Sequence, residues 1–592
     1  MRSAAEIAFR LRQETANIAL WMRPPRVPQT PAAGPFPVFP DPAKVAESLR
    51  ATPYRDRIRT VAECILKHRF PLLGFEVDTG PDIRWTRDSL SGIETPLDYF
   101  RKVPYLDPQR AGDHKVIWEL NRHQHLVLLA QELRFSGERR FLDEIVQQLE
   151  SWWAGNPFQC GMNWTSALEV AFRAVSWCWV WHLVSQDFPP AFLAQFATEL
   201  YRHGLHLEYN LSVYFSPNTH LLGEAVALHA IGRLFPTLPR SERWVRLGGR
   251  IVEQEIERQV RADGSHFEQS AYYHVYATDM FLFHAVLGET TAAYREKLAR
   301  MADYLEQLLG PSGLLPMFGD DDGGRFFDPY SSREDYALET LAAMGRPRHE
   351  RLNWSLAAWW GRTELRGELK IAQQGSGVII ETRGECHVLF DAGPFGPGSA
   401  GHSHADTLSI IVRRGREEIL TDPGTYTYVG DAAWRNRFRG TAMHNAIRID
   451  ELDQGEPGSP FSWRTKPDVR ITGKWAAECS YSGFVHRRRI EFDSPTKLVI
   501  TDEIEGPPGE HLVEQFWHPG CATQFITPQC AHIGEHAALS IIGGDTMTLT
   551  EGGDFGWRSP ALGVRMPAPV IVVQRTTALP AAFKTVLDLE AD

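Results

Sequence analysis

The sequence predicts a protein with two structural halves, a many-helix domain followed by an antiparallel β-sandwich. Apolar residues recur at helical spacing from about residue 40 to 360, and short Pro, Gly or Asn stretches separate the runs. After about residue 370 the sequence changes to short runs of alternating or continuous β-branched residues bounded by glycine. A chain of 592 residues is also too long for one ordinary core, which favours at least two domains.

The helical period is clearest in residues 165–184. Glu169 and Arg173 are spaced there to form an i,i+4 ion pair. One stripe of this segment is apolar, and it consists of Leu168, Phe172, Val175, Trp179 and Leu183. Similar patterns predict helices within residues 113–134, 220–235 and 292–310.

The second half contains six runs that are typical of strands, and no helix of any length is expected there. The change from helical to strand periodicity falls within residues 366–375, and a Pro-rich stretch at 23–44 is predicted to link a short N-terminal helix to the main body. The six strand-like runs are residues 377–384, 386–393, 407–415, 496–506, 511–520 and 538–544.

The composition limits the classes of function. A formal charge of -12 gives no basic footprint for nucleic acid. No run approaches the 18 apolar residues of a membrane span. The N-terminus lacks the continuous apolar segment of a secretory signal, so a cytoplasmic location is expected, with periplasmic or secreted locations open by another route. The seven scattered cysteines indicate neither a disulfide framework nor a zinc finger.

The most concentrated polar motif lies at the start of the run 407–415. His402 and His404 are two residues apart and would share one face of a strand, with Asp406 beyond them. Asp422 follows one apolar strand and His444 precedes another, so His404, Asp422 and His444 together could bind zinc or a similar divalent ion. Spacing alone equally allows Asp422 simply to cap the turn that follows it.

The helical half has polar clusters of its own. Asn218 and His220 stand where a helix begins, and read alone Asn218 is an ordinary N-cap. Tyr273 lies in a run of phenol and imidazole groups; a core aromatic cluster is one reading, but buried hydroxyls need partners, which favours a cleft for at least one of them. The acidic turn 320–322 reads as solvated, although a carboxylate pair could serve a glycosidase.

Eight blocks in order give the chain a resemblance that spacing could not supply. The chain resembles the heparinase II/III-like polysaccharide lyases. The blocks are DHKVIWELNRHQHL, NWTSALEVAFRAVSW, PNTHLLGEA, EQSAYYHVY, FGDDDGGR, GHSHADTLSI, LTDPGTYTY and FRGTAMHNAIRID.

The resemblance implies an incomplete α/α toroid followed by an antiparallel β-sandwich, with the active site in the cleft between them. It divides the chain into an N-terminal helix and linker at 1–45, a toroid domain at 46–365 and a sandwich domain at 366–592. Family members eliminate across the glycosidic bond at C4 of a uronic acid and leave an unsaturated sugar.

Carried onto this sequence, the resemblance assigns roles to individual residues. Tyr273 would be the catalytic acid or base and His402 the catalytic base, and Asn218 or His220 would neutralise the uronate carboxylate. The family often reads Asn-His consecutively, whereas Thr219 separates the two here. His404, Asp422 and His444 would hold one divalent metal in a structural role, zinc in the first place with manganese or calcium as alternatives, and Asp406 would orient one of the histidines.

The expected partner is an acidic polysaccharide or oligosaccharide: a glycosaminoglycan such as heparan sulfate, chondroitin sulfate or hyaluronan, or alginate, with a bacterial exopolysaccharide as an alternative. A glycoside hydrolase using acids among 320–322 with Glu268 or Glu224, and a non-catalytic polysaccharide-binding protein, are the competing hypotheses. The residues expected to hold sulfate, carboxylate or ring faces of the substrate are Asn121, Arg122, His123, Trp164, His274 and Arg439.

Overall fold

The computed structural model describes residues 3–346, 355–363, 365 and 375–590. The chain forms two compact units that interleave along the sequence. The helical unit comprises Met1–Gln259, Tyr276–Ala299 and Gly324–Arg366, and the β-rich unit comprises Val260–Val275, Arg300–Gly323 and Gly367–Asp592. The predicted change of periodicity at 366–375 lies almost wholly outside the described residues, and the domain boundary at 365/366 stays a prediction.

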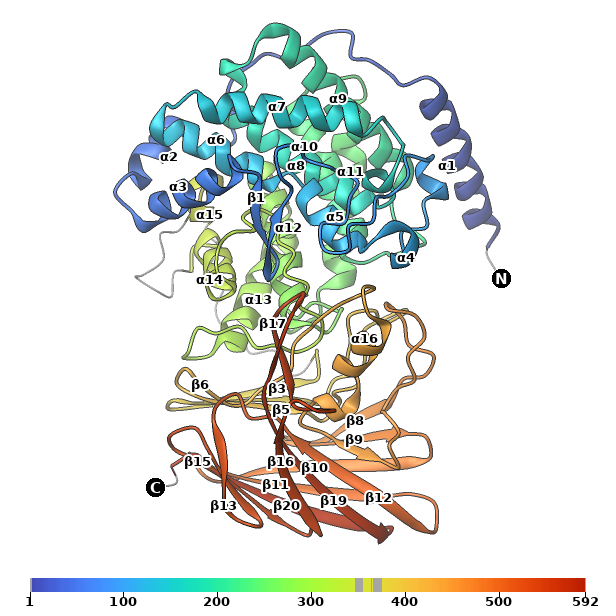
Figure 1. The fold of residues 1–592 in the computed structure, drawn as a ribbon, viewed down its shortest axis with the longest axis vertical. Helices are drawn as coiled ribbons and strands as arrows, with labels where there is room; N and C mark the ends of the chain where they lie inside the picture. The colour runs from blue at the N-terminus through green and yellow to red at the C-terminus, as the bar shows by residue number, and fades with distance from the viewer. Residues whose placement is uncertain (1–2, 347–354, 364, 366–374, 591–592) are drawn as a thin grey trace. The chain divides into compact units, whose positions relative to one another are not determined.

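Helices make up most of the helical unit, as the sequence predicts (Figure 1, blue to green). Helices α12 and α13 each contribute residues to both units. The helices are α1 (Ala4–Met22), α2 (Pro42–Leu49), α3 (Pro53–Ile65), α4 (Pro108–Ala111), α5 (His114–Asn121), α6 (Gln124–Ser136), α7 (Arg140–Gly155), α8 (Ala167–Val184), α9 (Pro190–Asn210), α10 (Thr219–Leu234), α11 (Ser241–Gln259), α12 (Ala271–Leu287), α13 (Ala292–Leu309), α14 (Arg333–Ala343) and α15 (Ser355–Trp360), with a small hairpin of β1 (Arg69–Leu72) and β2 (Phe75–Asp78).

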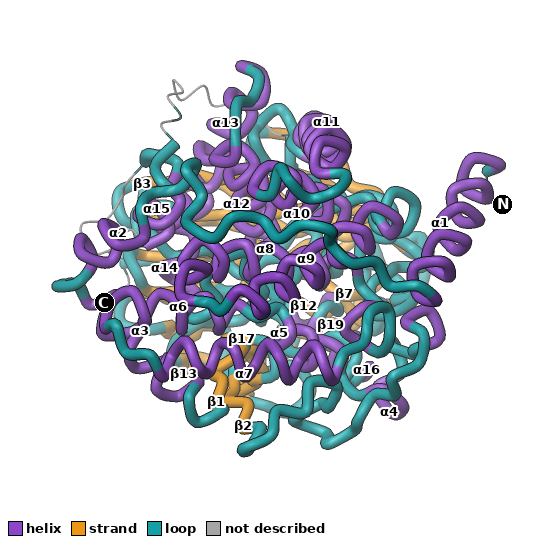
Figure 2. Tube along the Cα trace, turned by 90° about the horizontal axis from the view of Figure 1, so that it is seen from above, coloured by secondary structure: helices purple, strands orange, loops and turns teal. Residues whose placement is uncertain are grey.

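Helix α8 is the centre of the helical unit. It confirms the helix predicted at 165–184, and the residues of the predicted apolar stripe are buried. The other residues of the helix are buried as well, so its packing is not limited to that stripe. The helix packs against α6, α9 and α10, which surround it in Figure 2. The predicted pair also differs, because Glu169 binds Arg122 at 2.7 Å while Arg173 donates to His203 Nε2 and to backbone carbonyls.

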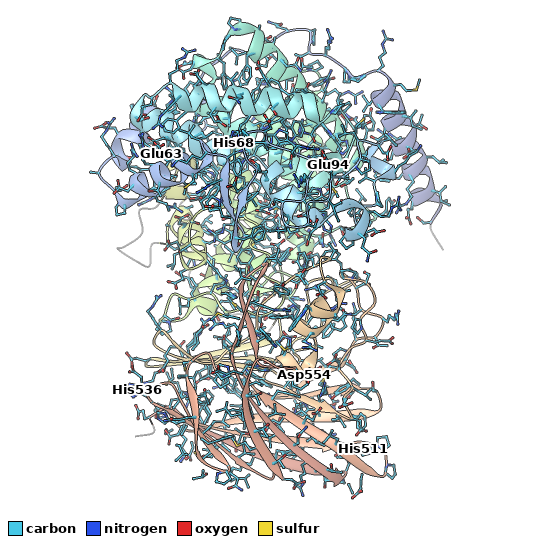
Figure 3. The ribbon with its side chains drawn as sticks, in the orientation of Figure 1. Glu63, His68, Glu94, His511, His536 and Asp554 are labelled. Atoms are coloured by element: carbon cyan, nitrogen blue, oxygen red, sulfur yellow. The ribbon has the colours of Figure 1, made fainter. Side chains whose placement is uncertain are left out.

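Close helix contacts in this unit depend on glycine. A Cβ at Gly248 of α11 would lie 2.5 Å from the carbonyl oxygen of Ala225 in α10. That distance is inside van der Waals contact, so only glycine lets the two backbones approach so closely. Partly exposed ion pairs also occur in this unit: Glu63, which is labelled in Figure 3, pairs with Arg59 at 2.9 Å. None of the described helices combines the length and apolarity needed to cross a bilayer.

The β-rich unit is built from antiparallel sheets (Figure 1, yellow to red). An eight-stranded sheet has the order β13-β14-β15-β20-β11-β10-β9-β8, and two four-stranded sheets have the orders β16-β19-β12-β7 and β3-β4-β5-β6. The strands are β3 (Val378–Arg383), β4 (Cys386–Asp391), β5 (Ile410–Arg414), β6 (Glu417–Leu420), β7 (Ile447–Ile449), β8 (Asp468–Gly473), β9 (Ala476–Tyr481), β10 (Phe484–Ser494), β11 (Lys497–Glu505), β12 (Glu510–Trp517), β13 (Thr523–Thr527), β14 (Cys530–Ile533), β15 (Ala537–Ile542), β16 (Thr546–Glu551), β17 (Trp557–Ala561), β18 (Val564–Pro567), β19 (Pro569–Ala578) and β20 (Ala581–Asp588).

One continuous core joins these sheets. Buried residues of β4 and β5, such as Phe390 and Val412, belong to the same cluster as Ile500 of β11 and Val513 of β12. Strand β11 alternates buried and more exposed positions, which is the pattern of a strand with one face on a core. The six predicted strand runs are confirmed as β3, β4, β5, β11, β12 and β15.

A short helix, α16 (Ala432–Phe438), interrupts the strands and was not predicted. Its seven residues are too few to display a helical period. The side chain of Asp431 caps it by accepting from the backbone N–H groups of Ala433 and Trp434. This helix carries Trp434 and Arg435.

Candidate functional site

The first turn of α12 is tied to the acidic turn 320–322 within the β-rich unit. Ser270 caps the helix, since its Oγ accepts from the N–H of Tyr273 at 3.1 Å. The same hydroxyl donates to the carbonyl oxygen of Asp320 at 2.6 Å, and the N–H of Asp320 donates to the carbonyl oxygen of His402 at 2.9 Å. Tyr273, Asp320 and His402 are therefore held together by the backbone as well as by their side chains.

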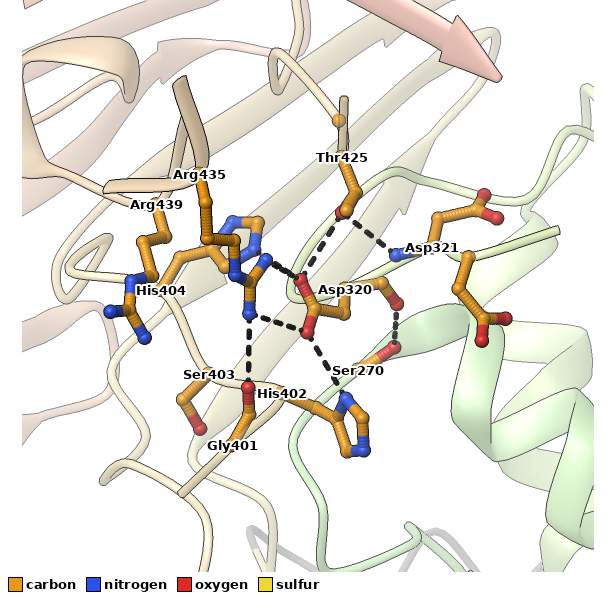
Figure 4. A network of polar contacts seen from close by, with 12 residues as sticks. Ser270, Asp320, Asp321, Gly401, His402, Ser403, His404, Thr425, Arg435 and Arg439 are labelled. Atoms are coloured by element: carbon orange, nitrogen blue, oxygen red, sulfur yellow. Dashed lines mark hydrogen bonds and ion pairs between the residues drawn. The ribbon is translucent and has the colours of Figure 1, made fainter. Parts of the chain in front are cut away.

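Asp320 lies at the centre of this site and contacts several of its side chains (Figure 4). Its Oδ2 lies 3.1 Å from His402 Nδ1, and its Oδ1 lies 3.0 Å from His404 Nε2. Arg435 of α16 forms a bidentate ion pair with both oxygens of the carboxylate. The pair is buried, with Asp320 completely enclosed. Burial alone would raise the pKa of Asp320, but Arg435 and the two histidines hold it well below its ordinary value, so the carboxylate stays charged.

Tyr273 lies directly on His402. The two rings stack with centroids 3.9 Å apart at an angle of 25°. The Tyr273 hydroxyl is 3.2 Å from Asp322 Oδ2 and 3.3 Å from the hydroxyl of Tyr428. Burial, followed by the neighbouring charge of Asp322, raises the pKa of Tyr273 well above its ordinary value. The phenol is therefore protonated near neutral pH and can act as a proton donor.

The two ring nitrogens of His402 differ in their hydrogen bonding. Nδ1 lies 3.1 Å from Asp320 Oδ2, and the side-chain hydrogen bond of His402 within the described residues is made by this nitrogen and not by Nε2. Burial lowers the pKa of His402, but the hydrogen bond to Asp320 and the charge of Glu268 outweigh it, so the pKa lies above its ordinary value. A carboxylate behind an imidazole fixes the tautomer and orients the ring, which is the arrangement of a general base or acid.

A second cluster adjoins this one through His404. Four residues, His404, Asp406, Asp422 and His444, each offer a donor atom, and these atoms all lie within 4.8 Å of one another. All four are buried. His404 Nδ1 and His444 Nε2 have no hydrogen-bond partner within the described chain, which is costly for buried polar atoms. Two imidazoles and two carboxylates suit a divalent cation such as zinc.

The structure thus brings together the three predicted ligands and adds Asp406 to them. His404 bonds Asp320 through Nε2, so the carboxylate that orients His402 also orients a residue of the second cluster. Burial and neighbouring carboxylates raise the pKa of Asp391, which lies near Asp406. A concentration of buried acids of this kind is stabilised by a bound cation.

Two buried side chains clamp the segments that carry this cluster. Asn445, next to His444, donates to the carbonyl oxygens of Ile410 at 2.8 Å and Thr421 at 2.9 Å. Arg488 of β10 donates to the carbonyl oxygens of Leu408 at 2.7 Å and Asn445 at 2.6 Å. Its charge is balanced by Asp502 at 2.7 Å. Arg488 therefore links the eight-stranded sheet to the segments at Leu408 and Asn445, and Asn445 extends this link to Thr421.

Asn218 and His220 belong to the helical unit. Asn218 is the N-cap of α10, where its Oδ1 accepts from the N–H of His220 at 3.1 Å. Its carbonyl oxygen accepts from Gln259 Nε2 at 3.0 Å. The capping geometry leaves the Nδ2 group of Asn218 as a donor, and both residues are only partly buried. Their role toward a carboxylate stays a prediction.

Four predicted substrate-binding residues are interior residues of the helical unit. Asn121 donates to the carbonyl oxygen of Trp85 and accepts from Trp152 Nε1. Arg122 forms ion pairs with Glu119 and Glu169. His123 accepts from Trp177 Nε1, and Trp164 packs in an aromatic core. This packing accounts for all four as structural residues, and a part in substrate binding stays a prediction.

The remaining two, His274 and Arg439, lie in the β-rich unit. His274 is 1% exposed, and its Nε2 lies 3.0 Å from the carbonyl oxygen of Met301. Arg439 is likewise buried and donates to Asn436 Oδ1 and to carbonyl oxygens of the 459–462 loop. Burial lowers its pKa to about 10. As packed, both side chains hold the protein's own backbone.

Sequence reasoning did not identify Arg435, Tyr428 or the central position of Asp320. In the sequence Asp320 is one residue of an acidic turn, and Tyr428 is the last residue of the block LTDPGTYTY. Arg435 lies outside all eight blocks, three residues before FRGTAMHNAIRID begins. A buried arginine needs a carboxylate partner, but its identity depends on tertiary packing. The ion pair between Asp320 and Arg435 is seen in Figure 4, and the hydroxyl of Tyr428 lies 3.3 Å from that of Tyr273.

The chain thus combines a helical unit with a unit of antiparallel sheets, and Tyr273 and His402 stack on each other within the second unit. Residues 40–327 match the heparinase II/III N-terminus model, and residues 367–580 match the heparinase II/III-like C-terminal model. The chain belongs to the heparinase II/III-like family, as its sequence blocks predict.

Two curated relatives carry the name heparin-sulfate lyase. The protein of Bacteroides stercoris is 22% identical over 67% of this chain and 62% of its own length, and that of Pedobacter heparinus is 25% identical over 67% and 61%. The chain thus spans somewhat less than two thirds of these relatives.

Solved structures confirm the fold. A crystal structure of heparinase III superposes with a TM-score of 0.63 at 17% identity, covering 81% of this chain and 78% of that one. A heparan sulfate lyase from Pedobacter heparinus superposes with a TM-score of 0.56 at 21% identity, covering 100% and 88%. The expected toroid followed by a β-sandwich is the observed fold class.

Proposed function

We propose that this protein is a polysaccharide lyase that cleaves a uronate-containing glycosaminoglycan by β-elimination, with heparan sulfate as the first candidate substrate. The stacked pair of Tyr273 and His402, backed by Asp320, is the observation that carries the proposal. The names of the curated relatives support the substrate class. Chondroitin sulfate, hyaluronan and alginate are the alternatives that the same chemistry allows.

The elimination removes the proton at C5 of the uronate, forms the C4–C5 double bond and breaks the bond from C4 to the glycosidic oxygen. The high pKa of Tyr273 suits it to protonate that leaving oxygen. His402 Nε2 would take the C5 proton before or as the bond from C4 to this oxygen breaks. This assignment applies when the C5 proton and the leaving oxygen lie on opposite faces of the sugar ring. If they lie on the same face, Tyr273 would have to take the C5 proton and also protonate the leaving oxygen, and it would first have to lose its own proton.

Removal of the C5 proton spreads negative charge into the uronate carboxylate. A donor must meet that carboxylate before the proton becomes acidic enough to leave. We assign this task to Asn218 Nδ2 or His220, since the capping geometry engages only the oxygen of the Asn218 amide.

His404, Asp406, Asp422 and His444 would hold one divalent cation, zinc in the first place. The two partnerless imidazole nitrogens support this assignment. When bound, the ion would supply a structural link between the segments that carry the four residues. His404 would transmit that order to Asp320 and hence to His402.

Chelation of the metal is expected to lower the melting temperature of the β-rich unit. A metal present at a hundredfold excess over its Kd stabilises the folded state by about 2.7 kcal/mol. Its removal should lower the Tm by about 5 to 10 °C. Calorimetry with and without chelator measures the change, and elemental analysis identifies the ion. The His444→Ala variant serves as control, because chelator should not shift its Tm further; an equal shift in this variant would reject the site.

The first assay follows ultraviolet absorbance of the unsaturated uronate while the protein is incubated with heparan sulfate, chondroitin sulfate, hyaluronan or alginate. A rise with one polymer identifies both the reaction and the substrate. Reducing ends that accumulate without absorbance would instead indicate hydrolysis. The structure disfavours Asp320 as a hydrolase carboxylate, because Arg435 and both histidines engage it. A flat signal by both methods would reject cleavage of these polymers.

A further inference from the structure

Arg565 of β18 is enclosed by aromatic rings. Its guanidinium carbon lies 3.7 Å from the ring centroid of Trp434, and 5.1 Å from those of Trp557 and Tyr426. Trp434 and Trp557 meet edge to face at 5.4 Å. The three rings and Arg565 are each partly exposed. We name these four residues the aromatic platform.

The charge of Arg565 is not balanced by a carboxylate. No described residue forms an ion pair or hydrogen bond with it, and its Nη1 atom is buried without an acceptor. Neighbouring arginines differ, since Arg437 pairs with Asp554 and Arg558 pairs with Glu418. Stacking on tryptophan stabilises a guanidinium cation but satisfies none of its N–H donors. Nε and Nη2, the two nitrogens of the guanidinium that are not buried, are therefore available to an anion from outside the chain, whereas Nη1 is enclosed.

The aromatic platform is joined to the candidate site by hydrogen bonds. The N–H of Gly563, in the β17–β18 hairpin, donates to the carbonyl oxygen of Tyr426 at 2.8 Å. Ser559 Oγ donates to the carbonyl oxygen of Thr425 at 2.8 Å, and Thr425 in turn donates to Asp320. Tyr426 precedes Tyr428 by two residues, which is about 7 Å of extended chain. The platform thus lies close to Tyr273 and His402 along one segment.

We propose that the aromatic platform is a binding subsite for an anionic sugar of the polysaccharide, outside the residue that undergoes elimination. Arg565 donates two parallel hydrogen bonds, from Nε and Nη2, to a sulfate or carboxylate, and the partly exposed rings around it contact the sugar that carries this anion. This inference rests on the proposed function for the identity of the polymer. In this proposal Arg565 contributes to the affinity for the polysaccharide and takes no part in the elimination step.

The test compares the wild-type protein with Arg565→Gln, which keeps the aliphatic stem and a polar end group but removes the guanidinium and its charge. The Kd of heparan sulfate is measured by calorimetry in a Tyr273→Phe background, so that binding is read without cleavage. The Kd is expected to rise about 10-fold or more in Arg565→Gln, as for loss of a hydrogen bond to a charged group. In the cleaving protein KM should rise while kcat stays unchanged.

Chemically desulfated heparan sulfate separates the two sources of the anion. An effect of Arg565→Gln on the sulfated polymer alone assigns the contact to sulfate, and an effect on both polymers assigns it to carboxylate. Arg489→Ala is the matched control, because Arg489 is exposed on β10 and pairs with Glu491. Equal affinities of wild type and Arg565→Gln, or no binding to the wild type, would overturn the subsite. Weakened binding without any cleavage would instead reject the lyase and retain the subsite.

Discussion

Replacing Tyr273 with phenylalanine is expected to lower kcat by about 10²- to 10⁴-fold, which is the usual contribution of a positioned acid or base. The change removes one hydroxyl and keeps the ring that stacks on His402. The Tm should therefore change little while the reaction loses its proton donor. Replacing His402 with alanine is expected to have an effect of similar size, measured as the rate of unsaturated uronate formation.

The controls for this prediction lie in the same unit. Tyr481→Phe also removes a buried hydroxyl, one that donates to the carbonyl oxygen of Ile447 at 3.4 Å in the sandwich, and should leave kcat unchanged. Tyr428 is the competing donor, since its hydroxyl is 3.3 Å from that of Tyr273. Full activity in Tyr273→Phe together with loss in Tyr428→Phe would transfer the acid role to Tyr428.

The fold class could be predicted because periodicity is a local property. Residues 165–184 and 496–506 show helical and strand periods, and both became the expected elements. The complete burial of α8 could not be predicted, because its polar residues Glu169 and Arg173 find partners on other helices. Helix α16 escaped prediction because seven residues carry too little pattern.

The interleaving of the two units was also beyond sequence reasoning. The segment 260–275 has helical neighbours in sequence but belongs to the β-rich unit. Tyr273 therefore shares a unit with His402, although 129 positions separate them. Motif resemblance suggested both residues, but only the packing of the first turn of α12 against the acidic turn explains why they meet.

The polar residues near the candidate motifs were harder to interpret. Arg122 and Asp320 both lie in charged stretches, and sequence spacing treats both as candidates for function. The structure uses Arg122 in an ion pair between α5 and α8, whereas Asp320 joins two histidines and an arginine. A charged residue reveals its role through its partners, and these are set by tertiary structure.

Replacing Asp320 with alanine is expected to destabilise the β-rich unit by about 3 to 5 kcal/mol, because it leaves the buried cation of Arg435 without its counter-charge. The substitution also removes the acceptor that orients His402 and His404. Activity should therefore fall even at temperatures where the variant remains folded. Chemical denaturation measures the first effect and kcat the second.

A double-mutant cycle separates the charge from the orientation. Arg435→Met should restore much of the stability lost in an Asp320→Asn background, since an apolar side chain removes the unpaired cation. It should not restore kcat, because the amide cannot replace the carboxylate behind His402. Asp328→Asn in the helical unit, where the carboxylate pairs with Arg57 at 2.9 Å, is the matched control that should lower stability and leave kcat intact. If the double variant regains kcat along with stability, Asp320 supports the fold alone and His402 does not depend on its charge.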